Sequence, residues 1–165
     1  MKTIKEILYK FRFLIVIYIL LAILFRTVFS LSVISSGSME PTLPVGDIVM
    51  GTRIFDSIDR GDIVVFKADR KLIKRVIGIE GDRIEIRDNK IYLNGEELNE
   101  DYLKEDMVAE DKIYIVPEGC IFVLGDNRND SIDSRYWEDP YVKCDKVISK
   151  ALFIIYPITE IQRVH

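Results

Sequence analysis

The sequence predicts a mainly β, antiparallel, barrel-like domain behind one N-terminal transmembrane helix. Two observations support this fold class. A long apolar stretch lies near the N-terminus, and after residue 35 the chain changes to short runs of Ile, Val, Phe and Tyr separated by Gly and Asp. Because no internal repeat, heptad or alternation of strands with helices is present, the strands are expected to pair directly with one another.

The apolar stretch covers residues 11–34 and contains 13 uninterrupted apolar residues from Phe13 to Phe25. It is long enough to cross a bilayer with some tilt. Arg26 lies toward its end, where a long side chain can extend to the membrane interface. A cleavable signal peptide also has a basic start and an apolar core, but its core is shorter and a site of small residues follows it. We therefore expect 11–34 to be a retained anchor.

Charge predicts the orientation of this anchor. Residues 1–33 contain five basic residues and one acidic residue, and four of the basic ones precede the apolar core. The positive-inside rule then places residues 1–10 in the cytoplasm and residues 35–165 outside it. The expected location is the cell membrane, with a single pass.

The remaining 132 residues contain 18 basic and 26 acidic residues, a net charge of −8. This length fits one ordinary domain with a single core. A nucleic-acid partner normally requires a basic surface, and nothing in this composition provides one.

Eight segments of this domain have the composition of strands. Asp88-Asn89 and Asn94-Gly95 are typical of tight turns between them. Residues 94–111 contain eight carboxylates and one lysine, which favours a solvated surface loop. The expected strands cover residues 47–50, 62–67, 71–79, 83–87, 90–93, 112–116, 121–124 and 147–155.

The residue inventory excludes several kinds of catalysis. The single histidine, His165, is the last residue, which argues against Ser-His-Asp, Cys-His and His-ligated zinc sites. No P-loop or dinucleotide-binding glycine motif is present. Cys120 and Cys144 are too few for a disulfide framework, and their redox state stays open. We expect neither a metal nor an organic cofactor.

A serine activated by a lysine remains available for acyl transfer. Ser38 lies in a polar segment with a glycine before it and Pro41 after it, which suits a stiff turn that a substrate backbone can approach. Lys74 alternates with Leu72 and Val76 on a predicted strand, so its face is apolar. The neighbouring Arg75 alternates with Ile73 and Ile77, so its face of the strand is equally apolar, but an arginine does not lose its proton in a protein. This favours Lys74 as a base.

Four segments resemble the sequence boxes of the type I signal peptidases, in the family's order, over about 100 residues. The resemblance is closest to the short form found in Gram-positive bacteria. The boxes correspond to residues 36–43 (SGSMEPTL), 61–66 (GDIVVF), 74–82 (KRVIGIEGD) and 125–135 (GDNRNDSIDSR).

The resemblance implies a role for each matched polar residue. Ser38 would be the nucleophile and Lys74 the general base. The Ser36 hydroxyl and the Ser38 backbone N–H would form the oxyanion hole.

The fourth box implies supporting roles. Ser131 would orient the lysine amine, while Asp133 and Arg135 would form a supporting ion pair. The family more often has Asp-Asn where this chain has Asn129-Asp130.

The function that this resemblance implies is a membrane-anchored serine endopeptidase that removes signal peptides from exported preproteins through an acyl-enzyme. Its partners would be the lipid membrane and preproteins with small residues at the first and third positions before the cut. Two alternatives stay open. One is a Ser-Lys protease specialised for another exported substrate, and the other is a membrane-tethered, non-catalytic β-domain that binds exported chains.

Overall fold

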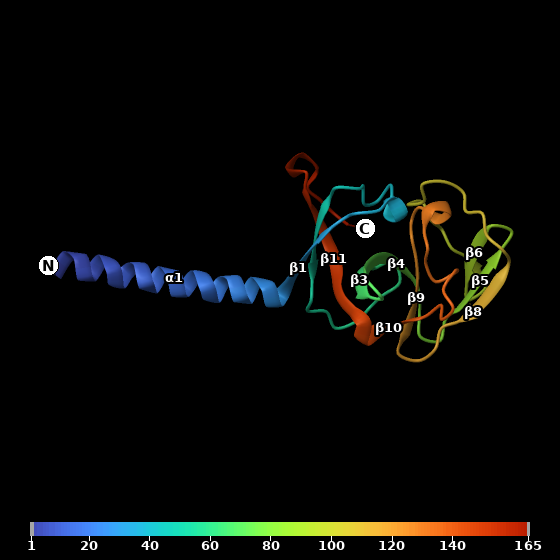
Figure 1. The fold of residues 1–165 in the computed structure, drawn as a ribbon. Helices are drawn as coiled ribbons and strands as arrows, with labels where there is room; N and C mark the ends of the chain where they lie inside the picture. Colours follow the sequence, from blue (N-terminus) through green and yellow to red (C-terminus); the bar gives the residue numbers. More distant parts are fainter. Residues whose placement is uncertain (1, 165) are drawn as a thin grey trace.

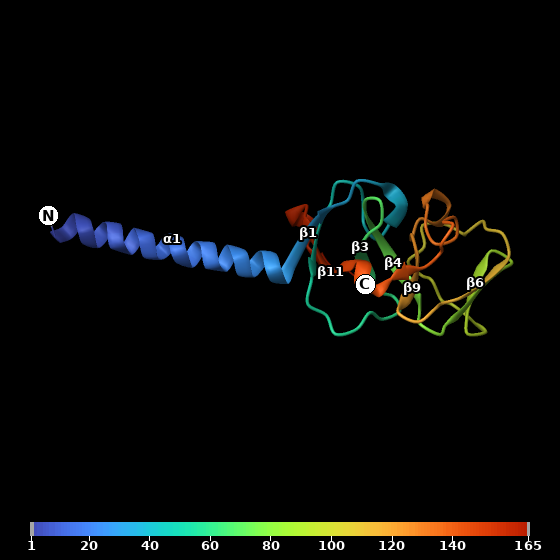
Figure 2. The ribbon, with the colours of Figure 1, turned by 60° about the horizontal axis from the view of Figure 1, so that its bottom comes forward.

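The computed structural model describes residues 2–164 and has one long helix that extends away from a β-rich domain (Figures 1 and 2). Helix α1 covers Lys2–Val28. Its segment Phe11–Val28 is apolar enough to cross a membrane, and at 1.5 Å per residue these 18 residues span about 27 Å. His165, which entered the prediction as a terminal residue, lies outside the described residues.

The domain contains two antiparallel sheets, which confirms the predicted fold class. The larger sheet has the order β1-β2-β11-β3-β4-β9-β10, and β12 pairs with β11. Its strands are β1 (Phe29–Val33), β2 (Ile48–Thr52), β3 (Ile63–Lys67), β4 (Lys71–Ile79), β9 (Cys120–Leu124), β10 (Val142–Lys143), β11 (Val147–Tyr156) and β12 (Gln162–Arg163). The smaller sheet has the order β7-β6-β5-β8 and contains β5 (Arg83–Arg87), β6 (Lys90–Leu93), β7 (Glu96–Glu97) and β8 (Lys112–Ile115). Within residues 2–164 the fold also has four 3-10 helices, namely η1 (Gly37–Met39), η2 (Arg128–Asp130), η3 (Cys144–Lys146) and η4 (Ile158–Glu160).

The structure shortens the expected anchor at its C-terminal end. The helix stops at Val28, and Phe29–Val33 forms β1, which pairs with β2. Polar Ser30 is buried there and its Oγ donates to Ser149 Oγ at 2.7 Å, while Ile34 joins the core of the domain. The predicted anchor, which ended at residue 34, therefore included a strand. The sequence of this strand, FSLSV, is mostly apolar, so hydropathy does not distinguish it from the end of the helix.

Each of the eight expected strands is present within one or two residues of its predicted ends. Both predicted turns are also confirmed. Asp88 and Asn89 have positive φ values of 52° and 62°, and Asn94 and Gly95 have 54° and 94°, the conformation that tight hairpin turns require. The strands β7, β10 and β12 have two residues each and were not predicted.

One apolar cluster of the core fixes the segment after β1. It combines Ile34, Met39 and Leu43 from that segment with Val49, Ile63 and Ile154 from the larger sheet. Because Met39 and Leu43 are fully buried, the short loop between them has little freedom to move away from the sheet. This packing positions the residue just before Met39, which is Ser38.

Candidate active site

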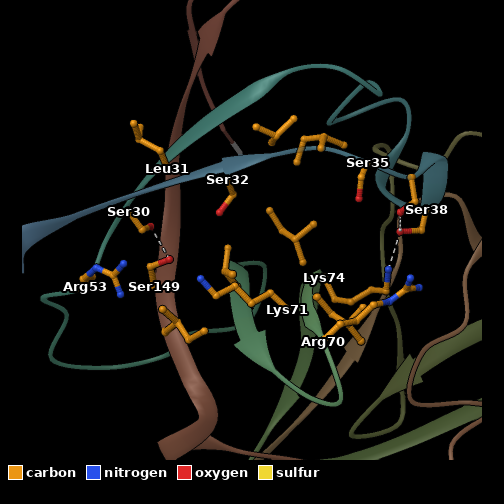
Figure 3. A pocket seen from close by; sticks show the side chains of 17 residues that line it. Ser30, Leu31, Ser32, Ser35, Ser38, Arg53, Arg70, Lys71, Lys74 and Ser149 are labelled. Atoms are coloured by element: carbon orange, nitrogen blue, oxygen red, sulfur yellow. Dashed lines mark hydrogen bonds between the residues drawn. The ribbon is translucent and has the colours of Figure 1, made fainter. Parts of the chain in front are cut away.

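The structure brings the predicted nucleophile and the predicted base into direct contact. Ser38 lies in η1 and Lys74 in the middle of β4, and Lys74 Nζ donates to Ser38 Oγ at 2.5 Å (Figure 3). Both side chains are removed from solvent, with exposed fractions of 7% for Ser38 and 4% for Lys74. A hydroxyl and an amine at this distance can exchange a proton without any rearrangement.

A network of backbone contacts holds the serine loop in place. Leu43 N donates to Met39 O at 2.8 Å, which closes the turn after Ser38. Asn127 connects the loop to the segment after β9, because its N–H donates to Ser38 O at 3.1 Å and its Nδ2 donates to Gly37 O at 3.0 Å. Ser38 is therefore fixed by its own turn and by a neighbouring loop.

The environment of Lys74 favours its neutral form. Burial removes the ammonium from water and lowers the pKa of Lys74 from 10.5 to about 8, although the carboxylates of Asp133 and Asp126 act in the opposite direction. Arg70 and Arg135 add smaller contributions that also lower this pKa. A lysine with a pKa near 8 has a substantial neutral fraction around neutral pH, which an ordinary lysine lacks.

Arg75, the other cation that the strand pattern left open, has a structural role. Its Nε and one terminal nitrogen donate to the two carboxylate oxygens of Asp126 at 2.9 and 2.7 Å. Thr42 Oγ1 also donates to Asp126 Oδ2 at 2.5 Å. Asp126 therefore connects β4 to the serine loop. The fourth sequence box includes Asp126, but nothing in the sequence pattern pairs it with Arg75.

Ser36 lies beside the nucleophile. Its side chain is exposed, and its Oγ is 3.3 Å from Ser38 Oγ. A hydroxyl at this place can turn toward a substrate carbonyl oxygen, which is what the predicted oxyanion role requires.

The fourth box lies against the dyad, as predicted, but one expected contact is missing. Ser131 is buried and lines a cavity together with Ser38 and Lys74. Among the described residues its Oγ has no hydrogen-bond partner, and the amine of Lys74 donates to Ser38 instead. Gly125 explains the close packing here, because a Cβ at this position would collide with the Ser131 side chain and with Ser38 O.

The predicted ion pair between Asp133 and Arg135 is present. Arg135 Nε donates to Asp133 Oδ1 at 2.8 Å, and Arg135 also donates to the backbone oxygen of Arg128 at 2.5 Å. Asp133 Oδ2 accepts from Gly125 N at 3.0 Å. Both side chains are almost fully buried, so this pair fixes the shape of the loop that carries Ser131.

The acidic segment 94–111 is more than the solvated loop that its composition favoured. Glu100 pairs with Arg128, which is fully buried, at 2.5 Å. The ring of Tyr102 lies 4.0 Å from the guanidinium of Arg75, and Lys104 pairs with Glu40 of the serine loop at 2.8 Å. A simple count of carboxylates concealed these contacts, because it does not distinguish a buried partner from a solvated charge.

Asn129 gives the unusual Asn-Asp order of the fourth box a physical explanation. Its Oδ1 accepts from Val108 N at 2.9 Å, and its Nδ2 donates to Asp106 O at 3.0 Å. The amide side chain thus satisfies a backbone donor and a backbone acceptor of the acidic segment, and a carboxylate cannot do both.

A cavity of about 320 Å³ leads from the helix end of the domain to the dyad. Figure 3 shows it between β1, which holds Ser30, Leu31 and Ser32, and the start of β4, with Ser38 and Lys74 at one end. Strand β1 lies at the edge of its sheet and pairs there with β2. Its other edge is available to a further strand.

Comparison with known proteins identifies the family. The model of the signal peptidase family, peptidase S26, matches residues 7–156. Signal peptidase I of Bacillus caldolyticus is 36% identical over 155 residues, which cover 81% of this chain and 82% of that protein. Signal peptidase I of Bacillus licheniformis is 32% identical over 176 residues and covers 96% of this chain and 94% of that protein.

A chloroplast protein and a solved structure show the same similarity. Thylakoidal processing peptidase 1 of Arabidopsis thaliana is 36% identical over 145 residues, which cover 78% of this chain and 42% of that longer protein. The crystal structure of a signal peptidase I from Enterococcus faecalis V583 is 35% identical and superposes with a TM-score of 0.52, covering 59% of this chain and 98% of the other. With a family model that matches most of its length, the chain belongs to the signal peptidase family, peptidase S26.

Proposed function

We propose that this protein is a membrane-anchored signal peptidase that cuts exported preproteins with Ser38 as nucleophile and Lys74 as general base. The observation that carries the proposal is the 2.5 Å contact between Lys74 Nζ and Ser38 Oγ in a buried setting that lowers the pKa of Lys74 to about 8. A neutral amine that contacts a serine hydroxyl is the minimal device for activating it.

The reaction proceeds in two halves. In the first, Ser38 Oγ attacks the carbonyl carbon of the scissile peptide bond while Lys74 Nζ takes the hydroxyl proton. The same proton then passes to the nitrogen of the leaving chain, and the signal peptide stays attached to Ser38 as an ester. In the second, a water loses a proton to Lys74 and attacks the ester carbonyl. The bond from this carbon to Ser38 Oγ then breaks, Lys74 returns the proton to Ser38 Oγ, and the signal peptide leaves with a free carboxyl group.

The oxyanion that forms in both halves would be stabilised by the Ser38 N–H and the Ser36 hydroxyl. The position of Ser36 Oγ, 3.3 Å from Ser38 Oγ, supports this role. We expect Ser36→Ala to lower kcat by about 10²- to 10³-fold, the usual loss for one oxyanion donor. Steady-state cleavage of a preprotein would measure this loss. A kcat within twofold of the wild type removes Ser36 from the mechanism and leaves the nucleophile untouched.

The fourth box would hold the dyad in its working geometry. We assign to Ser131 the orientation of the Lys74 amine, supported by its unpaired buried hydroxyl in the cavity that contains Lys74. A hydroxyl without a partner is free to accept from the amine once Lys74 has taken the proton of Ser38. The Asp133–Arg135 pair would keep the backbone around Ser131 in register.

The substrate would bind as an added strand beside β1. The free edge of β1 supplies backbone donors and acceptors along the cavity, and main-chain hydrogen bonds can hold an extended peptide there. Small residues would be preferred at the first and third positions before the cut, since Ile34, Ile73 and the dyad already fill the walls of this cavity.

The test uses the detergent-solubilised full chain and a preprotein with alanines at these two positions. We expect a product with the mass of the mature protein, and we expect a substrate with leucine in place of the alanine directly before the cut to stay intact. Binding without any cleavage would support the non-catalytic alternative. Cleavage of both substrates at equal rates would favour a Ser-Lys protease with another specificity.

The location of the domain is a further part of the proposal. The basic residues that precede the apolar core of α1 favour an N-terminus in the cytoplasm and a catalytic domain outside the cell membrane. In inverted membrane vesicles, residues 35–165 should be protected from added protease until detergent opens the membrane. Digestion of the domain in sealed inverted vesicles would show that the topology is the opposite of the proposed one.

A further inference from the structure

A second groove also opens at the dyad. It shares Leu72 with the β1 cavity but continues past Ser131 and Ile132, which do not line that cavity. We propose that it binds the first residues of the mature chain, those that follow the cut, and that it favours an apolar or aromatic residue next to an acidic one. This inference rests on the proposed function, because it assigns a place to the half of the substrate that leaves first.

The groove consists of two cavities that share walls. The first, of about 360 Å³, is lined by Ser38, Lys74 and Ser131 and continues past Leu72 and Ile132. The second, of about 730 Å³, also has Leu72 and Ile132 in its wall. A chain that leaves the dyad past these two side chains therefore enters the larger cavity directly.

The position of the membrane decides which half of the substrate lies where. Strand β1 follows α1 without a linker (Figure 1), and Ser30 near the start of β1 already lines the cavity. The apolar part of a signal peptide lies in the membrane and would enter from that end. A signal peptide that fills the β1 cavity up to the dyad leaves the second groove, past Ser131 and Ile132, for the mature half.

The walls of the larger cavity have the apolar character that a binding site for side chains needs. Phe66 and Trp137 pack edge to face with their ring centroids 6.1 Å apart. Ile132 is 74% exposed at the junction of the two cavities, and Tyr136 beside the dyad is 59% exposed. Large apolar side chains that stay in water next to a catalytic pair indicate a surface that a ligand covers.

The rim of the larger cavity has a charge opposite to that of the domain. It has more basic than acidic residues, whereas residues 34–165 together have a net charge of −8. Acidic residues early in the mature chain would therefore be attracted to this place. The basic residues are Lys67, Arg70, Lys143 and Lys146, and the acidic ones are Asp69 and Asp139.

The experiment compares two peptides with the same signal-peptide half. The short one ends one residue after the cut, and the long one continues for about six residues, or about 20 Å of extended chain, with a Phe and a Glu. For the full chain in detergent we expect the long peptide to have the higher kcat/KM through a lower KM. Cleavage of the short peptide tests the proposed function alone. If the short peptide is cut and the long one gains nothing, the groove proposal is wrong and the proposed function stands.

Variants then locate the effect. Ile132→Ser, at an exposed position that should not disturb folding, is expected to reduce the ratio of long to short kcat/KM by about tenfold, which corresponds to 1.4 kcal/mol. Ile113→Ser on β8 is the matched control, because Ile113 is 53% exposed and outside both cavities, and it should keep the wild-type ratio. An unchanged ratio in Ile132→Ser overturns the proposal.

Charge reversal at the rim is a second, independent test of the proposal. In Lys143→Glu/Lys146→Glu, both substitutions are at exposed rim positions, and we expect the preference for Glu over Lys in the long peptide to invert. Lys112→Glu, at an exposed site that lines neither cavity, changes the net charge in the same direction and is the control. An equal preference in the wild type and the double variant contradicts the assignment of this rim.

Discussion

Ser38→Ala and Lys74→Ala are each expected to lower kcat/KM for a preprotein by about 10⁴-fold or more, the range seen when one member of a serine-protease catalytic unit is removed. The alanine at 38 removes the nucleophile, and the alanine at 74 removes the group that takes its proton at 2.5 Å. Mass spectrometry of the preprotein after a fixed time would quantify the residual rate.

The double variant separates a dyad from two independent contributors. Because the two residues act as one unit, Ser38→Ala/Lys74→Ala should be no slower than the slower single variant. Ser57→Ala and Lys112→Ala, which change an exposed serine and an exposed lysine outside the active-site cavities, should retain wild-type rates. Near wild-type cleavage by either single dyad variant is incompatible with the mechanism.

The pH profile tests whether Lys74 works as the base. Its neutral form is the active one, so kcat/KM should rise with pH and reach half of its maximum near the pKa of about 8. The lowered pKa of Lys74 also makes the stability of the fold depend on pH. Because the folded pKa lies below the unfolded value of 10.5, the unfolded chain binds the extra proton between pH 8 and 10.5, and stability rises with pH in this window. Lys74→Met should lose this rise and stay folded, since it replaces a buried amine with an apolar side chain.

The sequence predicted the paired strands well because each has β-branched or aromatic residues, and because turns such as Asp88-Asn89 and Asn94-Gly95 mark some of their ends. It failed at Phe29–Val33, where a strand directly continues an apolar helix. Hydropathy measures only how apolar a window is, and a half-buried strand such as FSLSV is nearly as apolar as the end of a membrane helix. The hydrogen bonds to β2, which decide the matter, come from residues about 20 positions away.

In the active site too, some residues could be predicted from the sequence, whereas others could be recognised only from the contacts they make in the fold. Ser38 and Lys74 were predictable because they lie in two of the four ordered segments that resemble the boxes of the type I signal peptidases. Asp126 and Glu100 were not, since each is one of many carboxylates in an acidic chain. Only the fold shows that Asp126 pairs with Arg75 and that Glu100 pairs with a fully buried Arg128.

Asp133→Ala is expected to destabilise the domain by about 3–5 kcal/mol, the usual cost of removing one partner from a buried ion pair. The carboxylate accepts from Arg135 and from Gly125 N, and its loss leaves a buried guanidinium and a buried N–H without this partner. Denaturant unfolding of the full chain in detergent would measure the change. Asp145→Ala, at an exposed position, is the control and should change the unfolding free energy by less than about 0.5 kcal/mol.

Two further measurements separate the charge of Asp133 from its contribution to packing. In Asp133→Ala the guanidinium of Arg135 stays buried without its carboxylate. Adding Arg135→Met removes this guanidinium, so part of the lost stability should return. The carboxylate of Asp133 also raises the pKa of Lys74, so any residual activity of Asp133→Ala should begin at a lower pH than in the wild type. A profile that moves to higher pH would mean that the main effect of Asp133 on Lys74 is through the position of the loop, because the loss of a negative charge cannot raise the pKa of a lysine.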